Sequence, residues 1–186
     1  MKTVVMNTNQ LQTICENVGV LNESFLGVFP CDHIPPRPVQ QEKDIFCIVN
    51  FDPSYKDGSH WVTLIFRAGS KKDIYFDSYG RSPPSDQVHI LRSMKEGFVW
   101  NSVQLQHPLS TACGQWCIFF VCAHFTGHSL KNLRDHFSDK CDLLKNDFLV
   151  NEFVNSILPD DPIYEACNVE FVKKQFARRG IDLDHF

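Results

Sequence analysis

The sequence predicts an α+β fold, in which a small and mostly antiparallel sheet packs against a buried helix. The first half of the chain holds short apolar runs bounded by turn residues, which is the pattern of strands. The second half repeats apolar residues at helical spacing. Residues 112–126 are apolar on nearly every side, which is typical of a helix at the centre of a fold. One helix, then strands, then helices indicates α+β architecture.

The predicted elements of the first half begin with a helix over residues 8–18. Asn7 or Thr8 is its expected N-cap and Gly19 its stop signal. A proline-rich loop follows from Pro30 to Pro38. Strands are expected at residues 45–50, 60–67, 73–77 and 98–106, with a helix at residues 85–96.

The predicted elements of the second half are all helices. The buried helix spans residues 112–126, and Ser110 and Thr111 before it are both good helix caps. Further helices are expected at residues 129–137, 142–158 and 162–178, the last ending at Gly180.

Length and composition indicate one soluble domain over residues 1–186. Apolar residues make up 43% of the chain and charged residues 22%, which excludes intrinsic disorder. The net charge of −4 argues against a dedicated nucleic-acid binder. The longest apolar stretches, such as Cys117–Phe125, are too short to span a membrane, and the first residues lack the apolar core of a signal peptide.

Eight cysteines, most of them inside apolar runs, are too few for a disulfide scaffold. We therefore expect free thiols and a reducing compartment, the cytosol or the nucleus. A metal site is not expected. The candidate ligands lie on one continuous helical segment, which cannot wrap them around a single ion. They are Cys113, Cys117, Cys122, His124 and His128.

Cys113 is the first candidate for chemistry, because it opens the apolar helix. The positive end of the helix macrodipole would stabilise a thiolate there and lower its pKa. Gly114 follows it and leaves room for a substrate beside the thiol. Position alone leaves a structural buried cysteine equally open.

His60 and Asp77 are candidates for the base and its orienting group. His60 begins one predicted strand and Asp77 ends the next, so an antiparallel hairpin would bring both to the same end. A carboxylate there could bind one ring nitrogen and fix the tautomer of the imidazole. For a single pair of this kind taken alone, a surface His and a surface Asp without a function are the favoured interpretation.

Gln106 supplies a fourth element, seven residues before Cys113. Its side-chain amide, together with the backbone N–H of Cys113, would make an oxyanion hole. The four residues together favour a catalytic site over four unrelated side chains.

Three segments carry these residues: Gly58-Ser59-His60-Trp61, then Tyr75-Phe76-Asp77-Ser78-Tyr79-Gly80, then Gln106-x6-Cys113-Gly114. In order and spacing they resemble the adenovirus protease (adenain) family of cysteine proteases, which shares a clan with the SUMO-specific proteases. The 17-residue spacing from His to acid is shared by both families. The small residue before the cysteine, Ala112, is similar to adenain, whereas SUMO proteases typically place Asp there.

The resemblance implies a papain-like mechanism. Cys113 would be the nucleophile, His60 the base, Asp77 the orienting acid and Gln106 the oxyanion donor. Trp61 and Gly114 would line a narrow substrate groove that favours Gly near the scissile bond. The implied function is a cysteine endopeptidase that cleaves precursor proteins of a virus or virus-like element.

Alternatives with the same fold are an isopeptidase or processing enzyme for ubiquitin-like modifiers, an acetyltransferase effector and a non-catalytic binding protein. The complete set of four residues argues against the last of these.

The expected partners follow from the same resemblance. They are protein or peptide substrates. We expect no binding to a membrane or to nucleic acid, and we expect the chain to act as a monomer. Adenain is stimulated by DNA and by a disulfide-linked peptide, but residues 78–112 contain no cysteine for such a link. The sequence therefore requires no cofactor, and we expect neither activator. The expected location is the host cytoplasm or nucleus, or the virion.

Overall fold

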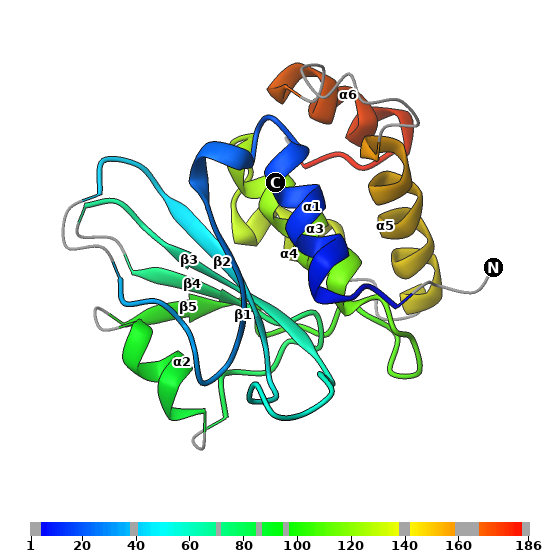
Figure 1. The fold of residues 1–186 in the computed structure, drawn as a ribbon. Coiled ribbons are helices and arrows are strands. Elements are labelled where there is room, and N and C mark those ends of the chain that lie inside the picture. Colours follow the sequence, from blue (N-terminus) through cyan, green and yellow to red (C-terminus); the bar gives the residue numbers. More distant parts are fainter. Residues whose placement is uncertain are drawn as a thin grey trace.

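A computed structural model describes residues 5–37, 41–69, 72–84, 87–94, 97–137, 142–158 and 168–183. A five-stranded sheet lies on one side of the molecule, and most helices gather on the other (Figure 1). The strands are β1 (Phe25–Pro30), β2 (Ile45–Asn50), β3 (Trp61–Phe66), β4 (Asp73–Phe76) and β5 (Phe98–Trp100). The helices are α1 (Thr8–Asn17), the short 3-10 helix η1 (Asn22–Ser24), α2 (Val88–Ser93), α3 (Cys113–Phe125), α4 (Leu130–His136), α5 (Leu143–Ile157) and α6 (Val169–Arg178).

The sheet has strand order β1-β2-β3-β4-β5. Its centre is antiparallel, because β3 pairs with β2 on one side and with β4 on the other in opposite directions. Both edge strands join in parallel, β1 against β2 and β5 against β4. The predicted antiparallel hairpin is therefore the core of a mixed sheet.

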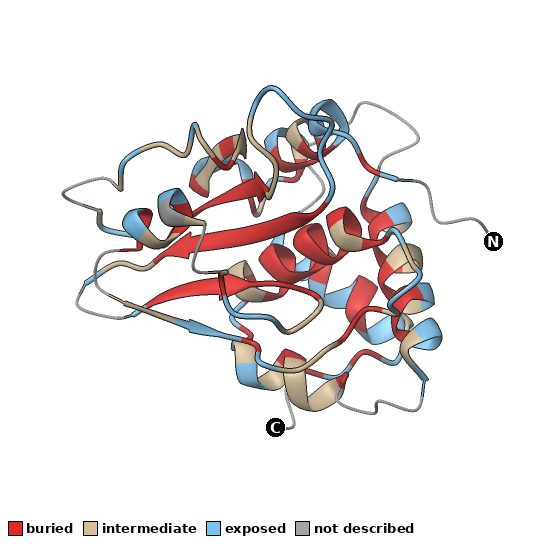
Figure 2. Cartoon of the chain, turned by 90° about the horizontal axis from the view of Figure 1, so that it is seen from below, coloured by how far each residue is buried: buried red, intermediate tan, exposed pale blue. Residues whose placement is uncertain are grey.

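Both faces of the sheet are covered. Along β3, Trp61 and Ile65 belong to the core shared with α1, α3 and α5, whereas Val62, Leu64 and Phe66 belong to a second core that α2 closes. This alternation follows from the two-residue period of a strand. Burial runs through the three central strands β2, β3 and β4 and through most of α3, and Figure 2 shows these strands in red. The helix that begins at Cys113 is thus held between the sheet and the outer helices.

Two strand expectations need correction. The strand expected at residues 98–106 ends at Trp100, because Ser102 has φ +50° and the chain leaves the sheet there. The strand Phe25–Pro30 was not among the predicted elements, since Gly27 and Pro30 give it the composition of a loop.

The helix expectations also shift at their ends. Neither Ser110 nor Thr111 caps α3, which begins after Ala112 with no capping side chain. The first helix ends at Asn17, and Asn7 is its N-cap. Parts of two predicted helices, residues 85–86, 95–96 and 162–167, and Pro38 of the predicted proline-rich loop lie outside the described residues.

Phe119 lies at the centre of an aromatic cluster between α3 and the outer helices. Its ring centroid is 5.2–5.8 Å from the rings of Trp116, Phe137, Phe153 and Phe176. Phe119→Ala removes a fully buried ring and leaves a cavity, so we expect a loss of about 3–5 kcal/mol in the free energy of unfolding. Urea denaturation measures this loss.

The matched control is Phe148→Ala on α5, where the side chain is 54% exposed. This variant should change the free energy of unfolding by less than about 0.5 kcal/mol. Equal losses in the two variants would contradict the central position of Phe119.

Candidate active site

Cys113 is the first residue of α3. The N–H groups of a helix's first turn have no acceptor within the helix, and they lie at the positive end of its macrodipole. Cys113 is half-buried, whereas the other five cysteines of the described part are buried, and all six are free thiols. Cys113 is therefore the described thiol most accessible to a substrate.

His60 and Asp77 meet at one end of the central hairpin. His60 directly precedes β3, and Asp77 directly follows β4. Asp77 Oδ1 is 2.8 Å from His60 Nε2, and the carboxylate is fully buried. Cys113 lies near enough to His60 to be among the groups that raise the pKa of the imidazole, and since Asp77 occupies Nε2, Nδ1 is the ring nitrogen left for the thiol. The structure thus brings together the three residues that hairpin register and helix position indicated.

The environment of His60 favours its protonated form. Burial lowers the pKa of His60, but the hydrogen bonds to Asp77 and Cys113 and the charges of these two groups outweigh burial and raise the pKa from 6.5 to about 9. The imidazole is therefore a strong acceptor for the thiol proton.

Two aromatic rings fix the plane of the imidazole. Tyr79 stacks on His60 with centroids 5.0 Å apart, and Phe51 contacts it edge-on at 5.1 Å. Burial and the nearby Cys113 raise the pKa of Tyr79, so its hydroxyl remains a donor. The analysis of the sequence did not identify either ring, although Tyr79 lies only two residues after Asp77.

Asn101 positions Asp77 and was also not identified from the sequence. Its Nδ2 donates to the Asp77 carbonyl at 2.7 Å, and its Oδ1 accepts from the Asp77 N–H at 3.2 Å. The β4–β5 pairing ends at Trp100, so this buried amide continues the ladder by one more residue. The sequence gives little signal for this role, because Asn101 is one of several polar residues between Phe98 and Gln106.

Gln106 is fully buried in the loop between β5 and α3. Its Oε1 accepts from Ser78 Oγ at 2.6 Å, and its Nε2 donates to the Ser110 carbonyl at 2.9 Å. Nε2 also lies 3.4 Å from the hydroxyl of Tyr79. The amide is thus fixed beside the segment that leads into Cys113. Its role as oxyanion donor stays a prediction.

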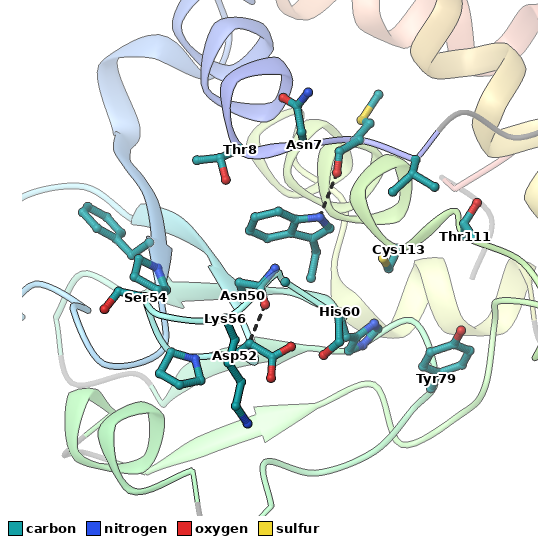
Figure 3. Close-up of a pocket in the computed structure, with 18 of the residues that line it drawn as sticks. Asn7, Thr8, Asn50, Asp52, Ser54, Lys56, His60, Tyr79, Thr111 and Cys113 are labelled. Atoms are coloured by element: carbon teal, nitrogen blue, oxygen red, sulfur yellow. Dashed lines mark hydrogen bonds between the residues drawn. The ribbon is translucent and has the colours of Figure 1, made fainter.

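A cleft of about 510 Å³ lies beside the Cys113 thiol. Cys113, His60, Tyr79 and Trp61 are among the residues that line it (Figure 3). Trp61 Nε1 donates to the Met6 carbonyl at 3.0 Å, which fixes the indole as a wall. Trp61 therefore lies where a groove wall was predicted.

Gly114 has a packing reason for lacking a side chain. A Cβ there would lie 2.9 Å from the Cβ of Met6, so the space beside Gly114 is filled by the N-terminal segment. A substrate contact at Gly114 stays a prediction.

Two further properties concern the described residues only. No three His, Cys, Asp or Glu side chains gather there as a possible metal site. The helices among them are all too short or too polar to cross a bilayer.

Residues 25–161 match the family model described as adenovirus endoprotease. The chain belongs to the adenovirus endoprotease family. The match confirms the resemblance inferred from the sequence, and its range contains His60, Asp77, Gln106 and Cys113.

Two curated relatives are adenovirus proteases. The protease of Ovine adenovirus D serotype 7 is 29% identical over 125 residues, which cover 56% of this chain and 59% of the relative. The protease of Snake adenovirus serotype 1 is 28% identical over 121 residues, which cover 57% and 59%. The chain thus matches about three fifths of the length of these adenovirus endoproteases.

Solved structures are similar to the chain at lower identity. An ASFV protease matches with a TM-score of 0.48 and 20% identity, over 64% of this chain and 45% of that one. The SUMO protease Ulp1 matches with a TM-score of 0.47 and 12% identity, over 81% and 78%.

Proposed function

We propose that this adenovirus endoprotease family member is a cysteine endopeptidase that cleaves precursor proteins of a virus or virus-like element. The observation that carries the proposal is that His60, hydrogen-bonded to the buried Asp77, lines the same cleft as the Cys113 thiol and lies close enough for that thiol to raise its pKa. A nucleophile, a base and an orienting group in that order are the parts that nucleophilic catalysis requires.

Acylation begins with a proton transfer. His60 Nδ1 takes the proton of the Cys113 thiol, while Asp77 holds Nε2 and stabilises the imidazolium. The thiolate then attacks the carbonyl carbon of the scissile peptide bond and forms a tetrahedral intermediate. As that intermediate collapses, the C–N bond breaks and His60 returns the proton to the leaving amine.

The oxyanion of the tetrahedral intermediate needs donors that are already in place. The backbone N–H of Cys113 is one of the first-turn donors of α3. Gln106 Nε2 is the proposed second donor, since its amide is held next to the segment that precedes Cys113. Donors of this kind typically contribute about 10²–10³ in kcat each.

Deacylation uses the same base. After the leaving amine departs, His60 takes a proton from water, and the resulting hydroxide attacks the thioester carbonyl. The C–S bond breaks, the carboxylic acid leaves, and the thiol form of Cys113 is restored with the proton held by His60. No further group is needed to balance these steps.

The proposed substrates are protein segments with Gly near the scissile bond. The indole of Trp61 lies beside the catalytic residues and is held in place by Met6, which supports a groove too narrow for large side chains. We propose that the enzyme acts as a monomer in a reducing compartment of the host cell or within the virion.

The test combines thiol alkylation with cleavage profiling. Cys113 is the accessible thiol of the described part, so limited iodoacetamide should modify it before Cys15, Cys47, Cys117 or Cys122. A peptide library derived from a proteome is digested with untreated and alkylated protein, and the new termini are sequenced. We expect cuts at Gly-containing sites that disappear in proportion to the modification of Cys113.

Three outcomes would contradict the proposal in different ways. Cuts that survive complete alkylation of Cys113 would exclude it as the nucleophile. A library left uncut, together with reaction of Cys113 with ubiquitin-like suicide probes, would indicate a modifier isopeptidase. A library left uncut without reaction of these probes would contradict a peptidase of either kind.

A further inference from the structure

Asn50 is a polar residue in the cleft that the catalytic steps leave without a role. It ends β2 and is paired in register with Trp61, the residue after His60. Its side chain is 95% buried, since its exposed fraction is only 5%. Asn50 Oδ1 accepts from the Asp52 N–H at 2.9 Å, which fixes the orientation of the amide.

This orientation places the donor end of the amide in the cleft. Figure 3 shows the oxygen of Asn50 bonded toward Asp52 and its nitrogen turned the other way, among the residues that line the cleft. Among the described residues Nδ2 donates to none, and it is not one of the fully buried side-chain atoms without a partner, so it is accessible from the cleft. A donor that is accessible in the cleft and has no partner in the protein can donate to an acceptor that enters the cleft, so a bound acceptor there gains a hydrogen bond.

Gly58 makes room for this amide. A Cβ at residue 58 would lie 2.0 Å from Asn50 Nδ2 and 2.7 Å from its Cγ. No L residue with a side chain fits there without moving the amide. Glycine at this position therefore keeps the donor of Asn50 in the cleft.

The neighbouring walls indicate what Nδ2 binds. Trp61, Phe29 and Pro30 line the same cleft as Asn50 and add apolar surface to its walls. An extended peptide presents a carbonyl oxygen at every residue, about 3.3 Å apart along the chain. The position of Asn50 is close to the catalytic base, because Phe51 N donates to the His60 carbonyl at 3.0 Å.

We propose that Asn50 Nδ2 donates a hydrogen bond to one backbone carbonyl of the substrate, on the Trp61 side of the scissile bond. Asn50 is then a residue that binds and aligns the peptide, and Gly58 is the residue that permits it. This inference rests on the proposed endopeptidase function and names a contact that selects extended peptide over other acyl compounds.

The test is Asn50→Asp combined with thioamide substrates. Aspartate keeps an oxygen that accepts from the Asp52 N–H, so this loop contact is retained. Its second oxygen is an acceptor at the position where Asn50 Nδ2 is a donor. We expect kcat/KM for a peptide substrate chosen by cleavage profiling to fall about 10- to 100-fold. Alkylation of Cys113 by iodoacetamide, which needs no peptide contact, should proceed at the wild-type rate.

A thioamide scan locates the bonded carbonyl. Each carbonyl of the substrate on the Trp61 side is replaced in turn by the weaker acceptor C=S. One replacement should lower kcat/KM of the wild type and have no further effect in Asn50→Asp. Gly58→Ala, which displaces the same amide, should lose sensitivity to that same replacement.

The results separate this inference from the function on which it rests. If wild type cleaves peptides and Asn50→Asp cleaves them within twofold as well, the inference fails and the endopeptidase remains. The inference also fails if every thioamide replacement affects wild type and Asn50→Asp alike. If wild type cleaves no peptide, the proposed function fails, and the inference fails with it.

Discussion

Cys113→Ala is expected to lower kcat/KM by about 10⁶, the largest effect of any single substitution in this chain. The substitution removes the sulfur that attacks the carbonyl, and none of the other five described cysteines is exposed enough to replace it. Alanine is a good helix former at the start of α3, so the fold should persist. Steady-state kinetics on a profiled peptide measures the loss, and circular dichroism checks the fold.

Cys117→Ala is the matched control, one helical turn further along α3. Burial raises the pKa of the Cys117 thiol well above its ordinary value, so this sulfur is a packed side chain and not a nucleophile. We expect kcat/KM to stay within about tenfold of wild type in this variant. A Cys113→Ala protein that keeps more than a small fraction of the activity would show that the nucleophile lies elsewhere.

The positions of Cys113, His60 and Asp77 could be predicted from the sequence because each lies at the end of a regular element. His60 and Asp77 flank two strands with a turn between them, and hairpin register then requires that they meet. Cys113 opens an apolar run long enough to be recognised as a buried helix. Their positions follow from local periodicity, which a single sequence contains.

The local structure around Asn101 and Gln106 could not be predicted because it depends on contacts between segments that are distant in the sequence. Asn101 reaches Asp77 only because the chain leaves the sheet at Ser102. Gln106 is held by hydrogen bonds to Ser78 and Ser110 and does not lie in a strand. The expected strand through residue 106 therefore put Gln106 near the segment that leads into Cys113, although no strand is present there. Such contacts leave no periodic pattern in the sequence.

Gly114 is a candidate residue for which the structure gives a second explanation. The sequence suggested an open space beside the thiol, and the structure fills that space with Met6. A glycine indicates only that a side chain is excluded. Whether the excluding group is a substrate or the protein's own chain depends on a segment more than 100 residues away in the sequence, as the two residue numbers show.

Asp77→Asn is expected to lower kcat/KM by about 10⁴. Asp77 Oδ1 accepts from both His60 Nε2 and the Tyr79 N–H, so an amide of the same shape should keep the local geometry. What it removes is the charge that stabilises the imidazolium, while the amide oxygen can still accept from His60 Nε2 and the Tyr79 N–H. Asp44→Asn is the matched control, because Asp44 forms a similar pair with His124 Nε2 at 2.9 Å, at the far end of α3. This control should leave kcat/KM within a few-fold of wild type.

The pH dependence distinguishes loss of charge at His60 from general damage to the site. In wild type the pKa of His60 is raised to about 9, so activity that needs the imidazolium should decline as the pH rises through 9. Asp77→Asn removes the first of the groups that raise this pKa, so its alkaline limb should move to lower pH. Because the pKa of the folded state is raised, the stabilisation by Asp77 is fully present below pH 6.5 and is lost as the pH rises through 9. Wild type should therefore exceed Asp77→Asn in unfolding free energy most at pH 6 and least above pH 9. An unchanged alkaline limb in Asp77→Asn would show that Asp77 does not control the charge of His60.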